Sequence, residues 1–372
     1  MSQSTLQMLH TGYERQQQRV TNDDVRRQYG VETVYRLSQN ENPLGPSPKV
    51  LDAIAQVAPT LASYPDYSDI ALREAIVQIT GRGFTPNHIY TGMSGYEALE
   101  ILARGFVKAG DEVIVSTPTF ISAYKKTSTL QGATVIDVPL HPETFAYDVD
   151  GVLNAITDRT RLILLCNPNN PTGTIVTASQ MKILMDNIPP HILVVSDEVY
   201  HHYVDDSNYP DSLQYVLDGK NLVLTYSFSK AYGLAGLRLG YGIARPEIAD
   251  YLASFHRGFH HSTFTLVAGT AAVLDTAHVQ KVVDFTKREM TWLLTEFERL
   301  SVSYWQPAAN FVLFKTPYDT RTMTEKFMEV GILVRPQHKS GLHDCVRVSI
   351  GTHEANQLFI HRLEEILATV EA

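Results

Sequence analysis

Residues 227–240, SFSKAYGLAGLRLG, place a lysine directly after an apolar run and an arginine eight residues later. The amine of Lys230 is a poor nucleophile when protonated, but as an imine with an aldehyde it can exchange with a substrate amine. Arg238 could bind a phosphate through two parallel N–H bonds, helped by the hydroxyls of Ser227 and Ser229. The alternative is a surface lysine beside an unrelated structural arginine. We favour one pocket for a phosphorylated aldehyde cofactor.

Three further polar residues follow two other apolar runs. Asp197 comes after residues 192–195, where a buried carboxylate needs a cationic partner such as a protonated pyridine nitrogen. That ion pair would make the ring a better electron sink. Tyr200 and Asn170, the latter in the turn NPNNPTG, could both reach a ring oxygen of the same cofactor. Taken singly, Asp197 could be a helix cap and Asn170 an ordinary polar turn.

The elements that position these residues are short runs rich in Val, Ile and Leu, which alternate with helical patterns from about residue 85 to 245. This alternation predicts an α/β domain with a mostly parallel sheet that is buried on both faces. The polar segments should then converge beyond the carboxyl ends of the strands. The expected strands are residues 111–115, 133–136, 161–165, 192–195 and 222–225.

Beyond residue 265 the pattern changes to longer amphipathic helices such as residues 278–300, with short strands at 310–314 and 346–349. A closing helix is expected over residues 352–370. The sequence therefore predicts a second, smaller α+β domain. The expected division is an N-terminal arm with part of the small domain (1–43), a large cofactor-binding domain (44–265) and a small C-terminal domain (266–372).

Composition excludes several classes of protein. The 372 residues are 44% hydrophobic and 19% charged, as in ordinary globular enzymes. A net charge of -9 without a basic tract argues against nucleic acid as a partner. No apolar stretch resembles a signal peptide or a membrane span, so we expect a cytoplasmic protein that does not enter the membrane. Neither the two cysteines nor the histidines form a metal-binding motif, and we expect reduced thiols and no metal.

Five segments together resemble the class I/II aminotransferases of fold type I, whose members bind pyridoxal 5'-phosphate (PLP). The resemblance spans residues 40–352 and is strongest to the histidinol-phosphate aminotransferase branch. It implies the type I fold, with a seven-stranded type of sheet between helices and a smaller α+β domain. In chain order the segments read NENPLGPSP, CNPNNPTGT, SDEVY, SFSKAYGLAGLRLGYGIA and CVRVSIGT.

The resemblance implies a role for each matching residue. Lys230 would carry PLP as a Schiff base and shuttle the proton, Asp197 would contact the pyridine nitrogen, and Asn170 and Tyr200 would contact the ring oxygen. The aromatic residue stacked on the ring would be Phe120. The cofactor phosphate would be held by Ser227, Ser229 and Arg238, and by Ser94, Gly95 and Tyr96 at the start of a helix.

The same resemblance implies substrate contacts and a second subunit. Arg347 would bind the substrate α-carboxylate, Arg335 would meet a distal phosphate or another anion, and Asn42 would also contact substrate. Tyr64 would reach across a homodimer to the partner's cofactor phosphate. The active sites would therefore be shared between two subunits.

The implied reaction is transfer of an amino group from a small amino donor to a keto acid such as 2-oxoglutarate. Histidinol phosphate, an aromatic amino acid and a specialised amino acid all remain candidate donors. Three departures from the branch concern this choice. Residues 11–19 read TGYERQQQR where a PYxPG-like segment is usual, Tyr96 stands where the branch usually has an acidic residue, and Phe120 stands where it often has tyrosine. The alternatives are a decarboxylase or lyase of the same fold, or a non-catalytic PLP-binding module.

Overall fold

The computed structural model describes residues 20–66 and 68–369, and its larger part is built on a seven-stranded sheet. In chain order the strands of this sheet are β2 (Ile89–Gly92), β3 (Glu112–Val115), β4 (Thr134–Asp137), β5 (Thr160–Cys166), β6 (Leu193–Asp197), β7 (Leu222–Ser227) and β8 (Gly240–Ile243). They lie in the order β2-β8-β7-β6-β5-β3-β4. Neighbouring strands are parallel except that β8 is antiparallel to both β2 and β7. The expected mostly parallel sheet is confirmed.

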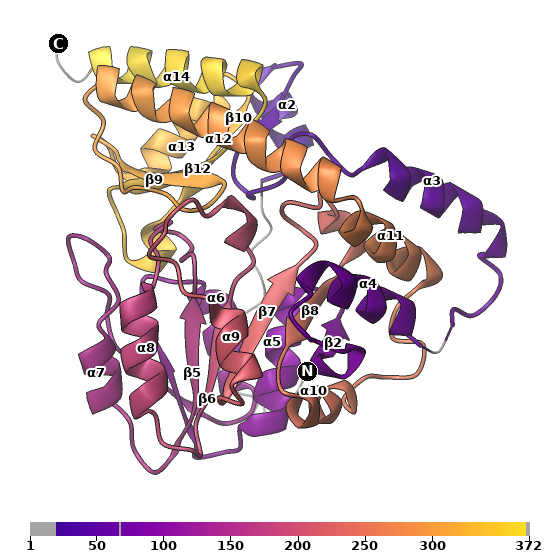
Figure 1. Cartoon of the computed structure of the whole chain (residues 1–372). Coiled ribbons are helices and arrows are strands. Elements are labelled where there is room, and N and C mark those ends of the chain that lie inside the picture. The colour runs from indigo at the N-terminus through magenta and orange to yellow at the C-terminus, as the bar shows by residue number, and fades with distance from the viewer. Residues whose placement is uncertain (1–19, 67, 370–372) are drawn as a thin grey trace, which may run out of the picture.

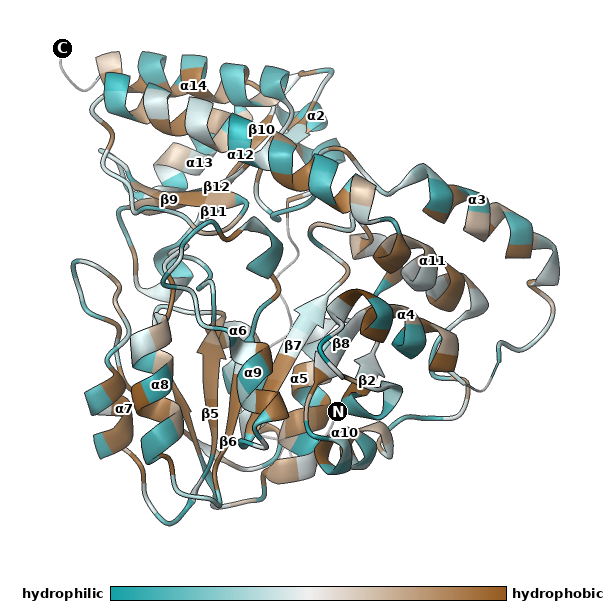
Figure 2. Ribbon diagram, in the orientation of Figure 1, coloured by the Kyte–Doolittle hydropathy of each residue, from teal (hydrophilic) through white to brown (hydrophobic). Residues whose placement is uncertain are grey.

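Both faces of the sheet are buried, as its apolar strands require. Successive residues of β5 alternate between two hydrophobic clusters: Ile163 and Leu165 belong to one, and Leu162 and Leu164 to the other. Figure 2 shows β5 and β6 as strongly hydrophobic ribbons among helices. The helices around this sheet are α3 (Pro48–Val57), α4 (Ile70–Thr80), α5 (Gly95–Phe106), α6 (Ile121–Thr129), α7 (Val149–Asn154), α8 (Ala178–Asn187), α9 (Ser212–Leu217), α10 (Pro246–Ala253) and α11 (Thr263–Leu274).

The sequence patterns found five of these seven strands and missed β2 and β8. Their sequences, IYTG and GYGI, are short and contain glycine, which weakens the pattern of a strand. Gly242 is paired with Tyr90, and a Cβ atom at Gly242 would lie 2.1 Å from the Tyr90 ring. The glycine therefore reflects the close packing of the antiparallel strand, which no local sequence pattern reveals.

The smaller part of the chain combines helices with two small sheets (Figure 1). Segments from both ends of the chain meet there, because β1 pairs in parallel with β10. The expected closing helix is confirmed as α14, which Thr352 caps. The elements are α2 (Asn22–Tyr29), β1 (Tyr35–Arg36), α12 (Thr276–Arg299), β9 (Phe311–Lys315), α13 (Thr320–Met328), β10 (Ile332–Leu333), β11 (Arg335–Pro336), β12 (Cys345–Ser349) and α14 (His353–Ala368); β11, β12 and β9 form an antiparallel sheet in that order.

The division between the two parts lies close to α11. Ala268 and Ala272 of α11 belong to the core cluster of the large sheet, and α11 packs on α3 and α4. Phe297, near the end of α12, belongs instead to the core of the small domain. We propose that the large domain extends to about Asp275, beyond the limit at residue 265 expected from the sequence.

Cys166 and Cys345 are both buried free thiols. Within residues 20–66 and 68–369, no group of three or more His, Cys, Asp or Glu side chains could hold a metal ion. No helix in this part of the chain is long and apolar enough to cross a membrane.

Gly242→Ala should destabilise the protein, because the new methyl group would collide with the Tyr90 ring. Overpacking of this kind costs about 1–3 kcal/mol. Gly236→Ala is the matched control, since a Cβ atom there would meet nothing within 4 Å. Thermal unfolding of the two variants should show a lowered melting temperature for the first alone, and equal melting temperatures would contradict the packing argument.

Candidate active site

Lys230 lies just after β7, and its amine is held by the N-terminal segment of the chain. Its Nζ donates to the carbonyl oxygen of Gln39 at 2.9 Å and lies 5.7 Å from the centre of the Tyr200 ring. Burial lowers the pKa of Lys230 to about 7; the positive charge of Arg347 lowers it further, and Glu41 opposes the shift. A substantial fraction of this amine is therefore neutral, and hence nucleophilic, near neutral pH.

Asp197 is the last residue of β6, and its side chain is 3% exposed. Tyr124 donates to its Oδ2 at 3.0 Å, and Thr225 donates to its Oδ1 at 3.2 Å. Burial raises the pKa of Asp197 to about 6, whereas these two hydrogen bonds lower it. A cationic ring nitrogen placed against this carboxylate would stabilise its charged form.

Tyr200 joins three segments of the chain at one hydroxyl. Its oxygen accepts hydrogen bonds from Asn40 Nδ2 at 2.9 Å and from Asn170 Nδ2 at 3.4 Å. Both bonds use lone pairs of the oxygen, so the phenolic proton stays available to a ligand. Burial raises the pKa of Tyr200 to about 12, so the phenol is protonated at neutral pH and can donate to a ring oxygen.

Four of the predicted phosphate-binding residues, Ser94, Gly95, Ser227 and Ser229, lie together at the start of α5. Ser94 caps this helix by accepting from the Glu97 N–H at 3.3 Å, and a Cβ atom at Gly95 would lie 3.5 Å from Ser227 Cβ. The Ser229 N–H donates to Ser227 Oγ at 3.1 Å. Because the first N–H groups of a helix lack partners within the helix, this arrangement suits an anion.

The chain also packs tightly around this helix start. A Cβ atom at Gly240 would lie 2.4 Å from the backbone nitrogen of Gly95, so only glycine allows β8 to approach α5. Arg238, two residues earlier, is exposed and has a left-handed backbone with φ of 56°. Its Nη1 donates to the carbonyl oxygen of Ala235 at 2.8 Å, in the 3₁₀ helix η4 (Ala235–Leu237). Its phosphate contact remains a prediction.

The residues expected to bind substrate come from the small domain and from the N-terminal segment. Arg347 of β12 is 7% exposed and donates to Asn170 Oδ1 and, at 2.8 Å, to the Ser38 carbonyl oxygen. Arg335 of β11 is its direct partner across the sheet. The Asn42 amide nitrogen donates to the Ala231 carbonyl oxygen at 3.0 Å, which fixes the Lys230 loop. A substrate contact for Asn42 stays a prediction.

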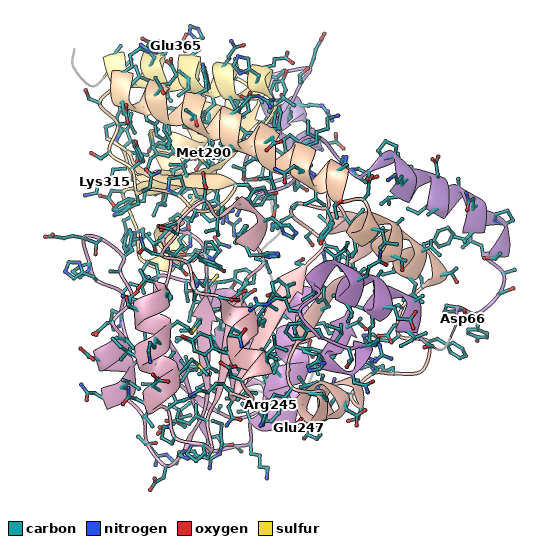
Figure 3. All side chains as sticks on the ribbon, viewed as in Figure 1. Asp66, Arg245, Glu247, Met290, Lys315 and Glu365 are labelled. Atoms are coloured by element: carbon teal, nitrogen blue, oxygen red, sulfur yellow. The ribbon has the colours of Figure 1, made fainter. Side chains whose placement is uncertain are left out.

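The three predicted aromatic contacts differ in their surroundings. Phe120 precedes α6 and is half-buried. Its ring and the Tyr124 ring meet edge to face, with 6.1 Å between the ring centres. Tyr96 is half-buried in the first turn of α5. Tyr64 is 82% exposed and stacks on Phe259 with 4.6 Å between ring centres. Asp66, two residues from Tyr64, lies at the outer edge of the molecule (Figure 3), so this segment projects away from the body.

The residues present fit PLP. A half-buried amine lies near a buried carboxylate, and a protonated phenol lies beside an asparagine amide. A helix start lined by serines lies at the same edge of the sheet. These groups match the aldehyde, the pyridine nitrogen, the ring oxygen and the phosphate of the cofactor.

Comparison with known proteins agrees with this geometry. Residues 32–363 match the family model described as aminotransferase class I and II. The chain belongs to this family. It is 39% identical over 347 residues to the histidinol-phosphate aminotransferase of Moorella thermoacetica (93% of this chain, 89% of that one) and 35% identical over 345 residues to that of Brevibacillus brevis (93% of each).

Solved structures give the same assignment. The histidinol-phosphate aminotransferase of Sinorhizobium meliloti, in complex with PLP, has a TM-score of 0.85 at 25% identity, covering 98% of this chain and 100% of that one. A single mutant of Thermus thermophilus aspartate aminotransferase has a TM-score of 0.82 at 26% identity, covering 93% of this chain and 94% of that one. The protein is thus a PLP-dependent aminotransferase of fold type I. This supports transamination over decarboxylation, elimination or a non-catalytic role.

Several residues that hold the site together were not predictable from a motif. Tyr124 and Thr225 bind Asp197, Asn40 binds Tyr200, and the carbonyl groups of Ser38 and Gln39 bind Arg347 and Lys230. A weak signal existed for Tyr124, which lies one helical turn after Phe120. Backbone carbonyl groups carry no residue-specific signal, so their roles could come only from the tertiary structure.

The lowered pKa of Lys230 predicts how PLP attachment to the apoenzyme depends on pH. Only the neutral amine attacks an aldehyde, so the rate should rise about tenfold per pH unit below about pH 7 and level off above it. Stopped-flow absorbance of PLP mixing measures this rate. A rate that still rises at pH 9 would contradict the burial of this amine.

Variants at two positions sharpen the test. Lys230→Ala should abolish covalent attachment while PLP still binds, and turnover should fall by at least about 10²-fold. In Arg347→Gln, the rate of PLP attachment should reach its plateau at a higher pH than in the wild type, because Arg347 lowers the pKa of Lys230.

Proposed function

We propose that this aminotransferase takes its amino group from histidinol phosphate and passes it to a keto acid such as 2-oxoglutarate. The observation that carries this proposal is the pairing of Arg335 with Arg347, directly opposite each other on β11 and β12. Directly opposed side chains of an antiparallel pair lie on one face, where two positive charges together attract an anion. We propose that the substrate phosphate binds there.

The names of the relatives support this choice of donor. The relatives named above from Moorella thermoacetica and Brevibacillus brevis are histidinol-phosphate aminotransferases. Residues 11–19, which depart from the usual N-terminal motif, lie outside the described residues. The other two departures, Tyr96 and Phe120, are both half-buried.

The side chains divide the work of transamination between them. PLP supplies an aldehyde and an electron-withdrawing ring. Lys230 would anchor it and, as the free amine, would move a proton at the substrate α-carbon. Asp197 would hold a charged ring nitrogen, and Tyr200 with Asn170 would contact the ring oxygen. Arg347 bonds to Asn170, so a substrate anion that binds this arginine is placed beside the cofactor.

A panel of amino donors tests the substrate. Histidinol phosphate should convert the enzyme to its pyridoxamine phosphate form in a single turnover, and 2-oxoglutarate should reverse the change. Histidinol and phenylalanine, which lack the phosphate, should react far more slowly. Efficient conversion by phenylalanine but not by histidinol phosphate would contradict the proposed donor.

Arg335→Gln should raise the KM for histidinol phosphate about ten- to a hundredfold, because a hydrogen bond to a charged group contributes about 1.5–3 kcal/mol. The KM for 2-oxoglutarate is measured in parallel. Arg321→Gln is the matched control: it removes the same charge from the small domain, but its side chain is 86% exposed on α13. Equal effects of both substitutions would contradict a specific phosphate contact.

We also propose that the enzyme is a homodimer in which Tyr64 serves the partner's site. The support is the exposure of Tyr64 on a projecting segment, where it contacts Phe259. A cytoplasmic location remains a prediction from the sequence.

Mixing two inactive variants tests the shared site. In a hybrid of Lys230→Ala and Tyr64→Ala subunits, one site carries both substitutions and the other carries neither. Activity should therefore return to about a quarter of the wild-type value after subunit exchange, as expected for random pairing of two variants in equal amounts. No recovery, in hybrids shown by mass spectrometry to have formed, would place Tyr64 outside the partner's site.

A further inference from the structure

Tyr124 lies one helical turn into α6 and is fully buried. Its hydroxyl donates to Asp197 Oδ2 at 3.0 Å, while Thr225 donates to Oδ1 at 3.2 Å. Each oxygen of the carboxylate thus has a fixed side-chain donor, and a backbone hydrogen bond from Val199 also lowers the pKa of Asp197. Because the terminal torsion of an aspartate is broad, a carboxylate with donors on both oxygens is far more restricted in orientation than one without.

We propose that Tyr124 is a positioning residue that holds the Asp197 carboxylate in the orientation required by the pyridine nitrogen of PLP. This inference rests on the proposed role of Asp197 as the partner of that nitrogen. Tyr124 itself need not touch the cofactor or the substrate, and its effect passes through one carboxylate oxygen.

The electrostatics of the buried site make this contact necessary. Burial raises the pKa of Asp197 to about 6, which would leave a fraction of it neutral near pH 7, and the hydrogen bond from Tyr124 opposes that shift. Burial and the Asp197 charge also raise the pKa of Tyr124 well above its ordinary value. The phenol therefore keeps its proton and acts as a permanent donor to the carboxylate.

The helix gives Tyr124 a second connection to the cofactor site. Phe120, the predicted stacking residue, directly precedes α6, and its ring contacts the Tyr124 ring edge-on with 6.1 Å between centres. One helical turn thus carries both the residue expected over the cofactor ring and the residue that orients the ring's acidic partner. A shift of α6 would change both contacts together.

The test compares the affinity of the apoenzyme for PLP and for an analogue in which C–H replaces the pyridine nitrogen. Tyr124→Phe keeps the ring and removes only the hydroxyl. It should raise the Kd of PLP about tenfold, which is the usual order for loss of a hydrogen bond to a charged group, and leave the Kd of the analogue nearly unchanged. Tyr147→Phe, another buried tyrosine, with no hydrogen bond to Asp197, is the matched control and should change neither Kd.

Two further variants separate this inference from the role of Asp197. Thr225→Val removes the second donor with almost no change of shape, and it should also weaken PLP but not the analogue. Asp197→Asn should weaken PLP strongly and the analogue little. If Asp197→Asn fails to discriminate between the two ligands, both roles are wrong; if it discriminates and Tyr124→Phe does not, only the positioning role is wrong.

Steady-state kinetics give an independent readout. Tyr124→Phe should lower kcat about tenfold with little change in KM, because the electron demand of the ring acts on the reaction step and not on substrate binding. A rise in KM at unchanged kcat would show that Tyr124 shapes the substrate pocket instead, and would overturn the proposal.

Discussion

The active site depends on the burial of one carboxylate at the carboxyl end of β6. Asp197 is held there by the sheet itself, since β6 pairs with β5 and β7 through this residue. A charged group in this place is costly in free energy unless hydrogen bonds and a cation compensate for the water it loses. Tyr124 and Thr225 supply hydrogen bonds, and a cofactor ring nitrogen at this place would supply the cation, so fold and cofactor binding would share one electrostatic constraint.

A short N-terminal segment connects the two domains at the cofactor. Ser38 and Gln39 offer their carbonyl oxygens to Arg347 and Lys230, and Asn40 donates to Tyr200. Asn40 also binds Ser349 of β12 through its N–H and its side-chain oxygen, both at 2.8 Å. The small domain, Lys230 and Tyr200 are therefore linked through three consecutive residues.

This linkage makes substrate binding and cofactor chemistry electrostatically dependent on each other. Arg347 lowers the pKa of Lys230, and it also bonds to Asn170, which reaches the same oxygen of Tyr200. An anionic substrate that neutralises Arg347 would raise the proton affinity of Lys230 at the moment when that amine must accept a proton. An anion bound at Arg347 would thus assist proton transfer to Lys230.

Much of the protein could be predicted from sequence because the informative residues follow local patterns. Buried parallel strands read as apolar runs, and Asp197, Asn170 and Lys230 each follow such a run, so the sheet and the polar residues at its edge were predictable. Strand β8, which contains Gly242, was not predictable from the sequence. Glycine is required at this position by close packing against the Tyr90 ring, and no local pattern shows that contact.

The tertiary structure decided what surrounds these residues. The hydroxyl of Tyr124, the amide of Asn40 and the carbonyl groups before it reach the site from segments far apart in the chain. Their partners and the burial that shifts each pKa are properties of packing. Sequence determined which groups are present and at which edge of the sheet; only the fold decided which groups share a hydrogen bond and which lose water, because both depend on contacts between distant segments.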